Sequence, residues 1–445
     1  MLHRRVLPLL LAALVMLPSL FLRLGGVSLP APAMVGVAGL AILGASFLLL
    51  WACDAAQADI SQALALAMVA LMAVLPEYAV DMYFTWQAGK HPQGDYAHFA
   101  IANMTGANRL LIGVAWGLIA LVFWLRYRRE VIIGVDRRME LLFLALATGY
   151  AFFIPLKGTL DWYDGVVLLG IYGWYILQAG KRPTAAEEAH GPAELLLALP
   201  RTWRWLATLG LFLVAGLAIL LNAQPFCEGL VATGRLLKIH EFLLVQWLAP
   251  IASEAPEFIV ALVFAWRGRA GLALGSLLSA KLNQWTLLVG MIPGIYALAH
   301  GSLGHPMPMD HFQMHEILLT ASQSLLAVVI LASLRLSVTS AVLLFTLFVG
   351  QLIVPELIAV RPGLFVGLQP SQVHPVFSFF YLVAALALYL HNPLHMKRLG
   401  QGLKVGADGC CGGEPSGDEL GLYSTDHCPQ CPWRKVAARA VEKAP

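Results

Sequence analysis

Long apolar runs, separated by short polar segments, make up almost the whole chain of 445 residues. Each run is long enough to cross the hydrocarbon core of a bilayer as a helix, which takes about 20 residues. Residues 227–240 are more mixed, and we expect them to form an amphipathic lead-in to the eighth span. The pattern predicts an all-α polytopic membrane protein of about twelve transmembrane helices, at 6–22, 33–52, 61–87, 97–125, 139–155, 163–179, 204–222, 241–266, 271–298, 315–334, 337–358 and 374–391.

Composition disfavours the main alternative, a large soluble core. Charged residues make up 12% of the chain, against about 25% in soluble domains, and the mean hydropathy is +0.73. The net charge of +3 is too small to indicate a nucleic-acid partner. The lipid bilayer is therefore the partner that composition predicts, and the oligomeric state stays open.

The distribution of Lys and Arg among the loops predicts the orientation. These residues are concentrated in alternate loops, such as 126–138, 181–204 and 267–269. Because positively charged loops stay in the cytoplasm, we expect a cytoplasmic (inner) membrane protein with both termini inside. Arg235 and Lys238 are the exception, since they fall on the outer side. The N-terminus has a basic start but no cleavage site of small residues, so we expect a retained first helix.

A Pro-Glu pair occurs inside two of the membrane-length runs. LMAVLPEYAVDMYFTW (71–86) and PIASEAPEFIVALVFAW (250–266) share it, and each is followed by a span that begins with small and polar residues. The predicted topology gives the two segments opposite orientations, which indicates an inverted repeat of the kind found in secondary transporters. We therefore expect two inverted five-helix repeats with an extra helix at each end.

The repeats define the expected domain organisation. It consists of an N-terminal helix at 1–30, a first repeat at 31–180 centred on 71–113, a cytoplasmic loop at 181–203, a second repeat at 204–360 centred on 250–290, a further transmembrane helix at 361–395 and a cytoplasmic tail at 396–445.

The Pro-Glu segments contain the groups of a cation site. Pro76 and Pro256 each remove a backbone donor, so we expect them to interrupt their helices and to free carbonyl oxygens. Such oxygens are tolerated in a membrane only where they face protein or a water-filled cavity. With the neighbouring carboxylates they provide hard oxygen ligands for Na⁺ or Ca²⁺. The spans that follow add amide oxygens, from Asn103, Asn108, Asn283 and Gln284.

The stretch CEGLVATGRLLKIHEFLLVQWLAPIASEAPEF, with GLALGSLLSAKLNQ after it, resembles the second α-repeat of the cation/Ca²⁺ antiporter superfamily, the sodium/calcium exchangers. PEYAVD, with IANMTGAN after it, resembles the first α-repeat. The resemblance implies that Glu77 and Glu257 are the central ion-binding carboxylates. It also implies a binding amide at Gln284, while Asn103 and Asn108 remain alternatives in the first repeat.

The chain departs from the family pattern at several site positions. Asp81 stands where the family has a serine, Glu254 replaces a hydroxyl residue, and Lys281 occupies an asparagine position. Asp81, Glu254 and Ser253 therefore join the expected ligand shell, with Arg109 and Lys281 as counter-charges. Because four carboxylates in a low-dielectric site cannot all ionise cheaply, we expect coupling to H⁺ rather than standard Na⁺/Ca²⁺ exchange.

We therefore expect a secondary-active antiporter that exchanges Ca²⁺ or Na⁺ against Na⁺ or H⁺ by alternating access, with no resident cofactor. The alternative is a non-transporting membrane scaffold or regulator derived from the same fold, in which the buried acids only form ion pairs between helices. An enzyme is disfavoured, because HEFLL (240–244) and HEILL (315–319) lack the second histidine of a zinc protease helix.

The polar tail contains the remaining candidate chemistry, four cysteines. A Cys-x₂-Cys pair is typical of zinc sites, whereas two adjacent cysteines are less suited to one. A tail Zn²⁺ site and free reduced thiols are the two alternatives. The residues are Cys410, Cys411, Cys428 and Cys431.

Overall fold

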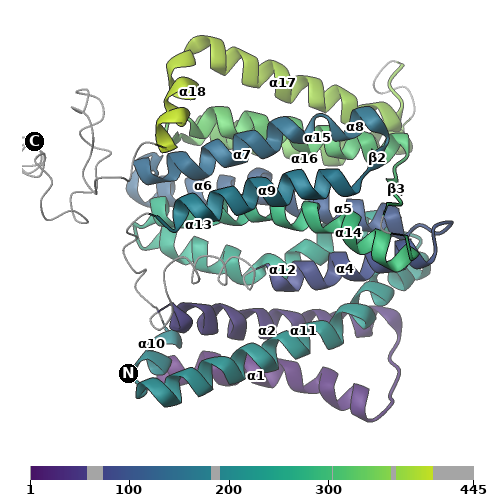
Figure 1. The fold of residues 1–445 in the computed structure, drawn as a ribbon, viewed down its shortest axis with the longest axis vertical. Helices are drawn as coiled ribbons and strands as arrows, with labels where there is room; N and C mark the ends of the chain where they lie inside the picture. Colours follow the sequence, from purple (N-terminus) through teal and green to yellow (C-terminus); the bar gives the residue numbers. More distant parts are fainter. Residues whose placement is uncertain (1, 58–73, 182–190, 303, 362–366, 404–445) are drawn as a thin grey trace, which may run out of the picture.

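A computed structural model of the chain describes residues 2–57, 74–181, 191–302, 304–361 and 367–403. The helices lie side by side in one bundle, with α1, α2 and α11 along one side and α15, α16 and α17 along the other (Figure 1). The helices of the first half are α1 (Leu2–Leu24), α2 (Ala31–Ala56), α4 (Leu75–Lys90), α5 (Tyr96–Leu110), α6 (Gly117–Tyr127), α7 (Arg138–Ala151), α8 (Ile154–Lys157) and α9 (Trp162–Ala179). Those of the second half are α10 (Ala193–Leu197), α11 (Arg201–Leu237), α12 (Glu241–Trp266), α13 (Ala270–Asn283), α14 (Val289–His300), α15 (His311–Leu331), α16 (Val338–Val360), α17 (Val373–His391) and α18 (Pro393–Leu399).

Ten segments of the described chain are long and apolar enough to cross a membrane. They correspond to ten of the expected spans. The other two expected spans correspond to α9 and to the segment that contains α4, whose first part, 61–73, lies outside the described residues. Large apolar side chains are exposed along α1, α11 and α17, which is typical of helices that face lipid.

The two halves of the bundle repeat the same unusual elements in the same order. α5 continues through the π-helix η1 (Leu111–Trp116) into α6, and α13 continues through the π-helix η3 (Gln284–Leu288) into α14. Short π-helical turns are rare and are frequent at functional sites. Each one follows a Pro-Glu helix and its hairpin partner, so both repeats contain the same wide turn at the matching place.

Two short antiparallel ribbons join the halves at their loops. β1 (Val131–Ile132) pairs with β4 (Arg335–Leu336), and β2 (Thr159–Leu160) pairs with β3 (Met307–Pro308). β1 and β3 both follow the span that contains the π-helix, whereas β2 and β4 both follow the next span, which is α7 with the short α8 in the first half and α15 in the second. A twofold axis that exchanges the repeats therefore exchanges the two ribbons as well, as expected for an inverted repeat.

The structure differs from the sequence prediction at two places. Residues 227–237 are not a separate lead-in, because α11 is one continuous helix from Arg201 to Leu237 and packs along α2. The predicted interruption at Pro256 is also wrong, since α12 runs through both Pro250 and Pro256. Neighbouring helices can accommodate the freed carbonyls of a membrane helix. Pro76, by contrast, stands in the first turn of α4, where its missing N–H is not needed.

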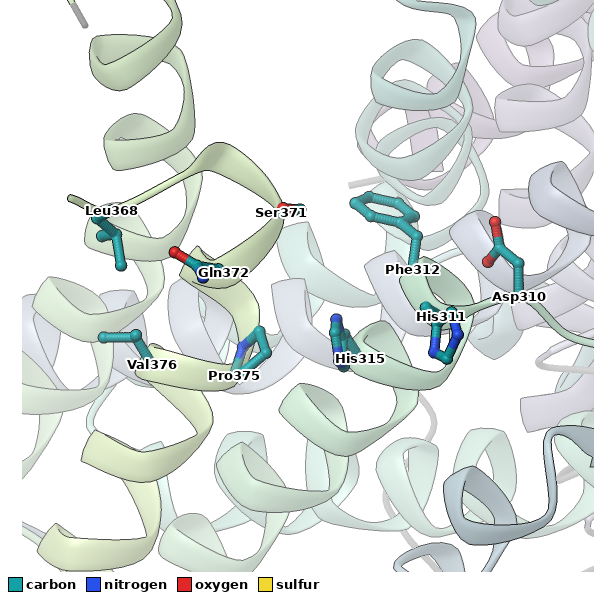
Figure 2. Close-up of a pocket in the computed structure, with 9 residues that line it drawn as sticks. All are labelled: Asp310, His311, Phe312, His315, Leu368, Ser371, Gln372, Pro375 and Val376. Carbon is teal, nitrogen blue, oxygen red and sulfur yellow. The ribbon is translucent and has the colours of Figure 1, made fainter.

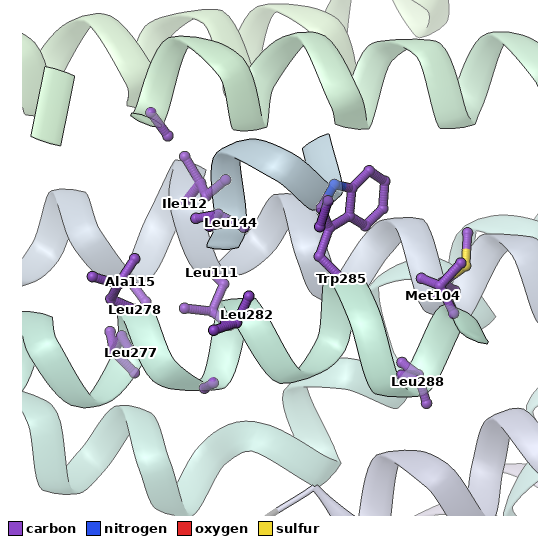
Figure 3. Packing of buried hydrophobic residues seen from close by; sticks show 14 of the residues in the cluster. Met104, Leu111, Ile112, Ala115, Leu144, Leu277, Leu278, Leu282, Trp285 and Leu288 are labelled. Carbon is purple, nitrogen blue, oxygen red and sulfur yellow. The ribbon is translucent and has the colours of Figure 1, made fainter. Parts of the chain in front are cut away.

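Part of the hydrophobic core lies between the two spans that contain π-helices. Leu111 and Ile112 of η1 lie near Leu278 and Leu282 of α13, with Trp285 at the start of η3 (Figure 3). All five side chains are buried. In a bilayer, close packing of this kind drives helix association. It also fixes the backbone on either side of the wide turns, next to which Asn108, Asn283 and Gln284 are located.

A cluster of hydrogen bonds closes the loop before α9. The Asp161 carboxylate accepts from Lys157 Nζ at 3.0 Å, from Thr159 Oγ1 at 2.8 Å and from Tyr163 OH at 2.9 Å. Burial by itself would raise the pKa of Asp161, but these donors outweigh burial and hold the pKa below its ordinary value.

We expect Asp161→Asn to lower the Tm at neutral pH. Because the folded-state pKa is lowered, the ionised carboxylate stabilises the fold above the ordinary aspartate pKa of about 3.9. This contribution is lost as the pH falls through the lowered pKa. Thermal unfolding in detergent at a series of pH values measures it. The difference between wild type and variant should close in acid, and a difference that does not change with pH would contradict the prediction.

Candidate ion-binding site

The Gln284 side chain connects the acids of the two repeats. Its Nε2 donates to Glu77 Oε2 at 2.9 Å and to Glu254 Oε1 at 2.7 Å. All three side chains are buried. The two carboxylate oxygens are therefore no farther apart than the sum of these distances, although α4 and α12 belong to opposite halves of the chain.

The backbone places these three residues at special positions. Glu77 lies in the first turn of α4, where free N–H groups and the helix dipole favour negative charge. Glu254 lies in α12 between Pro250 and Pro256, and each proline leaves a carbonyl of the preceding turn without its usual donor. Gln284 is the first residue of η3. The Pro-Glu helices and the wide turn thus bring charge and free oxygens to one place.

One oxygen of each bridging side chain has no hydrogen-bond partner among the described residues: Glu77 Oε1, Glu254 Oε2 and Gln284 Oε1. Most buried polar atoms are paired, so three oxygens without a partner in one cluster are candidate ligands for a cation. Carboxylate and amide oxygens are the ligands that Ca²⁺ prefers. Within the described ranges, no group of three or more His, Cys, Asp or Glu side chains is arranged to hold a metal. A cation here would therefore use the Gln284 oxygen together with the two carboxylates.

A second polar cluster lies one turn further along α4. Asn103 Nδ2 donates to Asp81 Oδ1 at 2.8 Å. Asp81 also borders a cavity of about 10 Å³, which Tyr78 and Thr85 line from the same helix and which has room for about one water molecule. Tyr78 OH, Thr85 Oγ1 and Asp81 Oδ2 have no partner in the described part of the chain. Asp81 thus belongs to a separate polar cluster beside the Gln284 bridge.

The other expected ligands of the second repeat lie on α12, near Glu254, and at the end of α13, next to Gln284. Glu257 follows Glu254 by one turn, is half-buried and interacts electrostatically with Glu77. Ser253 Oγ donates back along its own helix, to the main-chain oxygens of Ala249 at 3.2 Å and Pro250 at 3.3 Å. Asn283 is buried at the end of α13. The bridge between the repeats therefore includes Glu254 rather than Glu257.

Arg109 pairs with an acid that the sequence analysis did not identify. Its guanidinium forms an ion pair with Glu316 of α15, and both side chains are fully buried. Thr105 Oγ1 at 3.0 Å and Gln246 Nε2 at 2.7 Å donate to the same carboxylate oxygen, and His374 Nδ1 lies 3.2 Å from the other. Arg109 is thus the counter-charge of Glu316. The available signal was an acid inside the apolar run 315–334, where ionisable residues are functional or paired.

Lys281 contacts an asparagine of the first repeat. Its ammonium donates to Asn108 Oδ1 at 2.6 Å and to the Asn108 main-chain oxygen at 3.3 Å. The two asparagines that the resemblance left open therefore have different partners, because Asn103 contacts Asp81 and Asn108 contacts Lys281.

Gly106 allows α5 to approach α12 closely. A Cβ at this position would lie 1.9 Å from the Gln246 main-chain oxygen, which has no helical donor because Pro250 follows four residues later. We expect Gly106→Ala to push the helices apart and to lower the stability by about 1–3 kcal/mol, the usual cost of overpacking. Thermal unfolding measures the change. Gly170→Ala on α9, where the space is open, is the matched control, and equal Tm values for the two variants would contradict the prediction.

A larger cavity lies elsewhere, between the beginnings of α15 and α17 (Figure 2). Its volume is about 730 Å³, and it contains none of the expected ion ligands. It is lined by Asp310, His311, Phe312, His315, Leu368, Ser371, Gln372, Pro375 and Val376. The four tail cysteines, Cys410, Cys411, Cys428 and Cys431, lie outside the described residues.

Two inverted repeats that meet at buried carboxylates define a secondary-transporter fold. The sequence model of the sodium/calcium exchanger protein family matches residues 30–179 and 207–355, which is more than half of the chain and includes both Pro-Glu segments. The chain belongs to this family, which confirms the resemblance. It is therefore a multi-pass membrane protein of a transporter family rather than of an enzyme family.

Individual relatives agree with this assignment. The chain is similar to a crystal structure of the H⁺/Ca²⁺ exchanger CAX, with 40% sequence identity and a TM-score of 0.83. The match covers 90% of this chain and 98% of that one. A structure of the sodium-calcium exchanger NCX_Mj, at 19% identity, has a TM-score of 0.50 over 73% of this chain and 98% of its own and supports the fold alone. A membrane protein of Methanocaldococcus jannaschii is 25% identical over 244 residues, which is 54% of this chain and 70% of the relative.

Proposed function

We propose that the protein is an antiporter that moves Ca²⁺ across a membrane in exchange for H⁺ by alternating access. The observation that carries the proposal is the Gln284 amide, which joins Glu77 to Glu254 and leaves one oxygen of each of the three side chains unpaired. The likeness to a crystal structure of an H⁺/Ca²⁺ exchanger, at 40% identity, supports this choice of ions.

The proposed ligand set is built around this bridge. Ca²⁺ takes about 6–8 oxygen ligands, of which Glu77 and Glu254 supply the charged ones and Gln284 a neutral one. Glu257 and Ser253 lie on the same stretch of α12 as Glu254 and are the nearest additional ligands. The amide of Asn283 adjoins Gln284. Asp81, with Asn103, is a separate acid that would carry a proton.

The Gln284 side chain can serve both when protons occupy the acids and when Ca²⁺ occupies the site. An amide donates from its nitrogen and accepts with its oxygen. When protons occupy the acids, Nε2 donates to the two carboxyl groups. When Ca²⁺ occupies the site, half a turn of the amide presents Oε1 to the ion instead. The same side chain thus supports alternate occupancy by protons or by Ca²⁺.

Charge explains the competition between H⁺ and Ca²⁺. Two adjacent carboxylates in a low-dielectric interior cannot both stay ionised without a compensating positive charge. Two protons or one Ca²⁺ neutralise the same pair, so the binding of one displaces the other. Asp81 and Glu254 take positions where the family resemblance leads us to expect hydroxyl residues, and titratable groups at those positions favour H⁺ as the coupling ion.

We further propose that the protein lies in the cytoplasmic membrane with both termini inside, as the loop charges predict. The beginning of α1 and helix α18 both lie on the left side of the bundle in Figure 1, towards which the same ends of the helices point, and this supports placing them on one side of the membrane. The proposed units remain two repeats at 31–180 and 204–360, which nearly coincide with the ranges that match the family model.

A pH gradient imposed on proteoliposomes is expected to drive Ca²⁺ against the proton flow. A Ca²⁺-sensitive dye inside the vesicles measures the flux, and nigericin, which collapses the pH gradient, should abolish it. Flux that ignores the pH gradient but follows a Na⁺ gradient would refute coupling to H⁺. A folded protein that moves no cation at all would favour the non-transporting scaffold.

A further inference from the structure

The ammonium of Lys281 is fully enclosed beside the acid bridge. Lys281 has no exposed surface. Its Nζ donates to Asn108 Oδ1 at 2.6 Å and to the Asn108 main-chain oxygen at 3.3 Å, and it lies 4.6 Å from the centre of the Trp285 ring. Asn108 is itself oriented, because its Nδ2 donates to the Met104 main-chain oxygen at 2.8 Å. Two oxygens and an aromatic face thus surround one positive charge.

Oxygens of these kinds are ligands that a monovalent cation takes in a transporter. Backbone carbonyls near helix interruptions coordinate such ions in many secondary transporters, and a side-chain amide oxygen is a similar neutral ligand. Asn108 supplies one oxygen of each kind, three residues before η1 begins. The lysine presents its charge to the oxygens that a free cation would use.

The position of Lys281 relates this charge to the acid bridge. Lys281 precedes Gln284 by three residues, which places the two side chains on neighbouring turns of one span. Glu254 and Glu77 are close enough to interact electrostatically with the Lys281 side chain. A fixed positive charge in this low-dielectric region opposes a second mobile cation at the same place.

We propose that Lys281 is a built-in cation: its ammonium, held by both oxygens of Asn108, fills the place of a monovalent cation beside the acid bridge and makes the exchange independent of Na⁺. The inference rests on the proposed function and names the residue that restricts the coupling ion at that site. Specificity then comes from a repulsive element as well as from the attractive ligands.

Lys281→Met, which keeps the length of the side chain but removes its charge, tests the proposal. In proteoliposomes that contain the wild type, replacing an organic cation by Na⁺ should leave Ca²⁺ flux unchanged. In the variant, the Ca²⁺ flux in Na⁺ should differ about tenfold from the flux in the organic cation. A change of this size is usual for coupling between two ligand sites. Lys90→Met, which removes an exposed lysine at the end of α4, is the matched control and should behave as the wild type.

Binding of radiolabelled Na⁺ to detergent-purified protein without Ca²⁺ separates this inference from the proposed function. The Met variant should bind Na⁺, the wild type should not, and an added Asn108→Leu should abolish the new binding. If the wild type moves no Ca²⁺, the proposed function fails while the Na⁺ comparison still decides the role of Lys281. If the Met variant does not fold, Lys281→Gln provides the same comparison. A folded neutral variant that ignores Na⁺ in both assays would overturn the inference.

Discussion

Glu254→Gln is expected to abolish Ca²⁺ transport and to leave the protein folded. The substitution removes one of two charges that a buried cation requires, and losing one partner of a buried charged pair costs about 3–5 kcal/mol. This corresponds to a loss of Ca²⁺ affinity of more than about 100-fold. Glutamine keeps the size of the side chain, and its carbonyl oxygen can still accept from Gln284 Nε2. The variant therefore keeps the hydrogen bond to Gln284 but loses the negative charge at position 254.

Vesicle flux and calorimetric Ca²⁺ titration measure this loss. Glu77→Gln should have the same effect, because its carboxylate makes the matching hydrogen bond. Glu130→Gln, in an exposed loop, is the control for the substitution itself. We expect Glu257→Gln to cost less than Glu254→Gln. If Glu257→Gln alone abolishes transport, the central acid of α12 is the one that the family resemblance names, and the bridge has a structural role.

Glu316→Gln is expected to have the second large effect, on stability rather than on ion selectivity. It leaves the fully buried Arg109 guanidinium without a counter-charge, which costs about 3–5 kcal/mol. Glu316 also accepts hydrogen bonds from Thr105 of α5 and Gln246 of α12. The loss therefore loosens contacts between the two repeats. Thermal unfolding in detergent and the yield of monodisperse protein measure the effect.

A second substitution identifies the cause. Arg109→Met in the Glu316→Gln background removes the unpaired charge, so we expect the double variant to regain a large part of the stability. Glu130→Gln is again the control. A Glu316→Gln variant with the wild-type Tm would contradict the prediction. So would a double variant less stable than Glu316→Gln alone, because the buried charge would then not be the reason for the loss.

The fold was largely predictable because the length of an apolar run is a local property of the chain. The expected spans follow from runs of apolar residues, and the two Pro-Glu segments indicate the inverted repeat. The continuity of α12 at Pro256 was not predictable from local rules. A proline removes one hydrogen bond from a helix, and whether the helix continues depends on the neighbours that pack against it. The continuous α11 depends in the same way on its packing along α2.

The polar residues of the proposed site could be identified in the sequence, but the contacts between them could not. Glu77, Asp81, Glu254, Gln284 and Lys281 are unusual inside membrane-length runs, and all of them are buried. Which groups touch depends on the crossing of helices that are distant in sequence. Gln284 is separated from Glu77 by 207 positions, and Arg109 from Glu316 by the same number. Spacing within one helix therefore identified Glu257 as readily as Glu254 and gave no partner for Arg109.

Anomalous diffraction from crystals grown with Ca²⁺ tests most directly whether one cation binds between the repeats. We predict a single strong peak in contact with both Glu77 Oε1 and Glu254 Oε2, with the amide oxygen of Gln284 turned towards it. A peak beside Asp81 and Asn103 instead, or one that neither bridging carboxylate contacts, would contradict the proposed site.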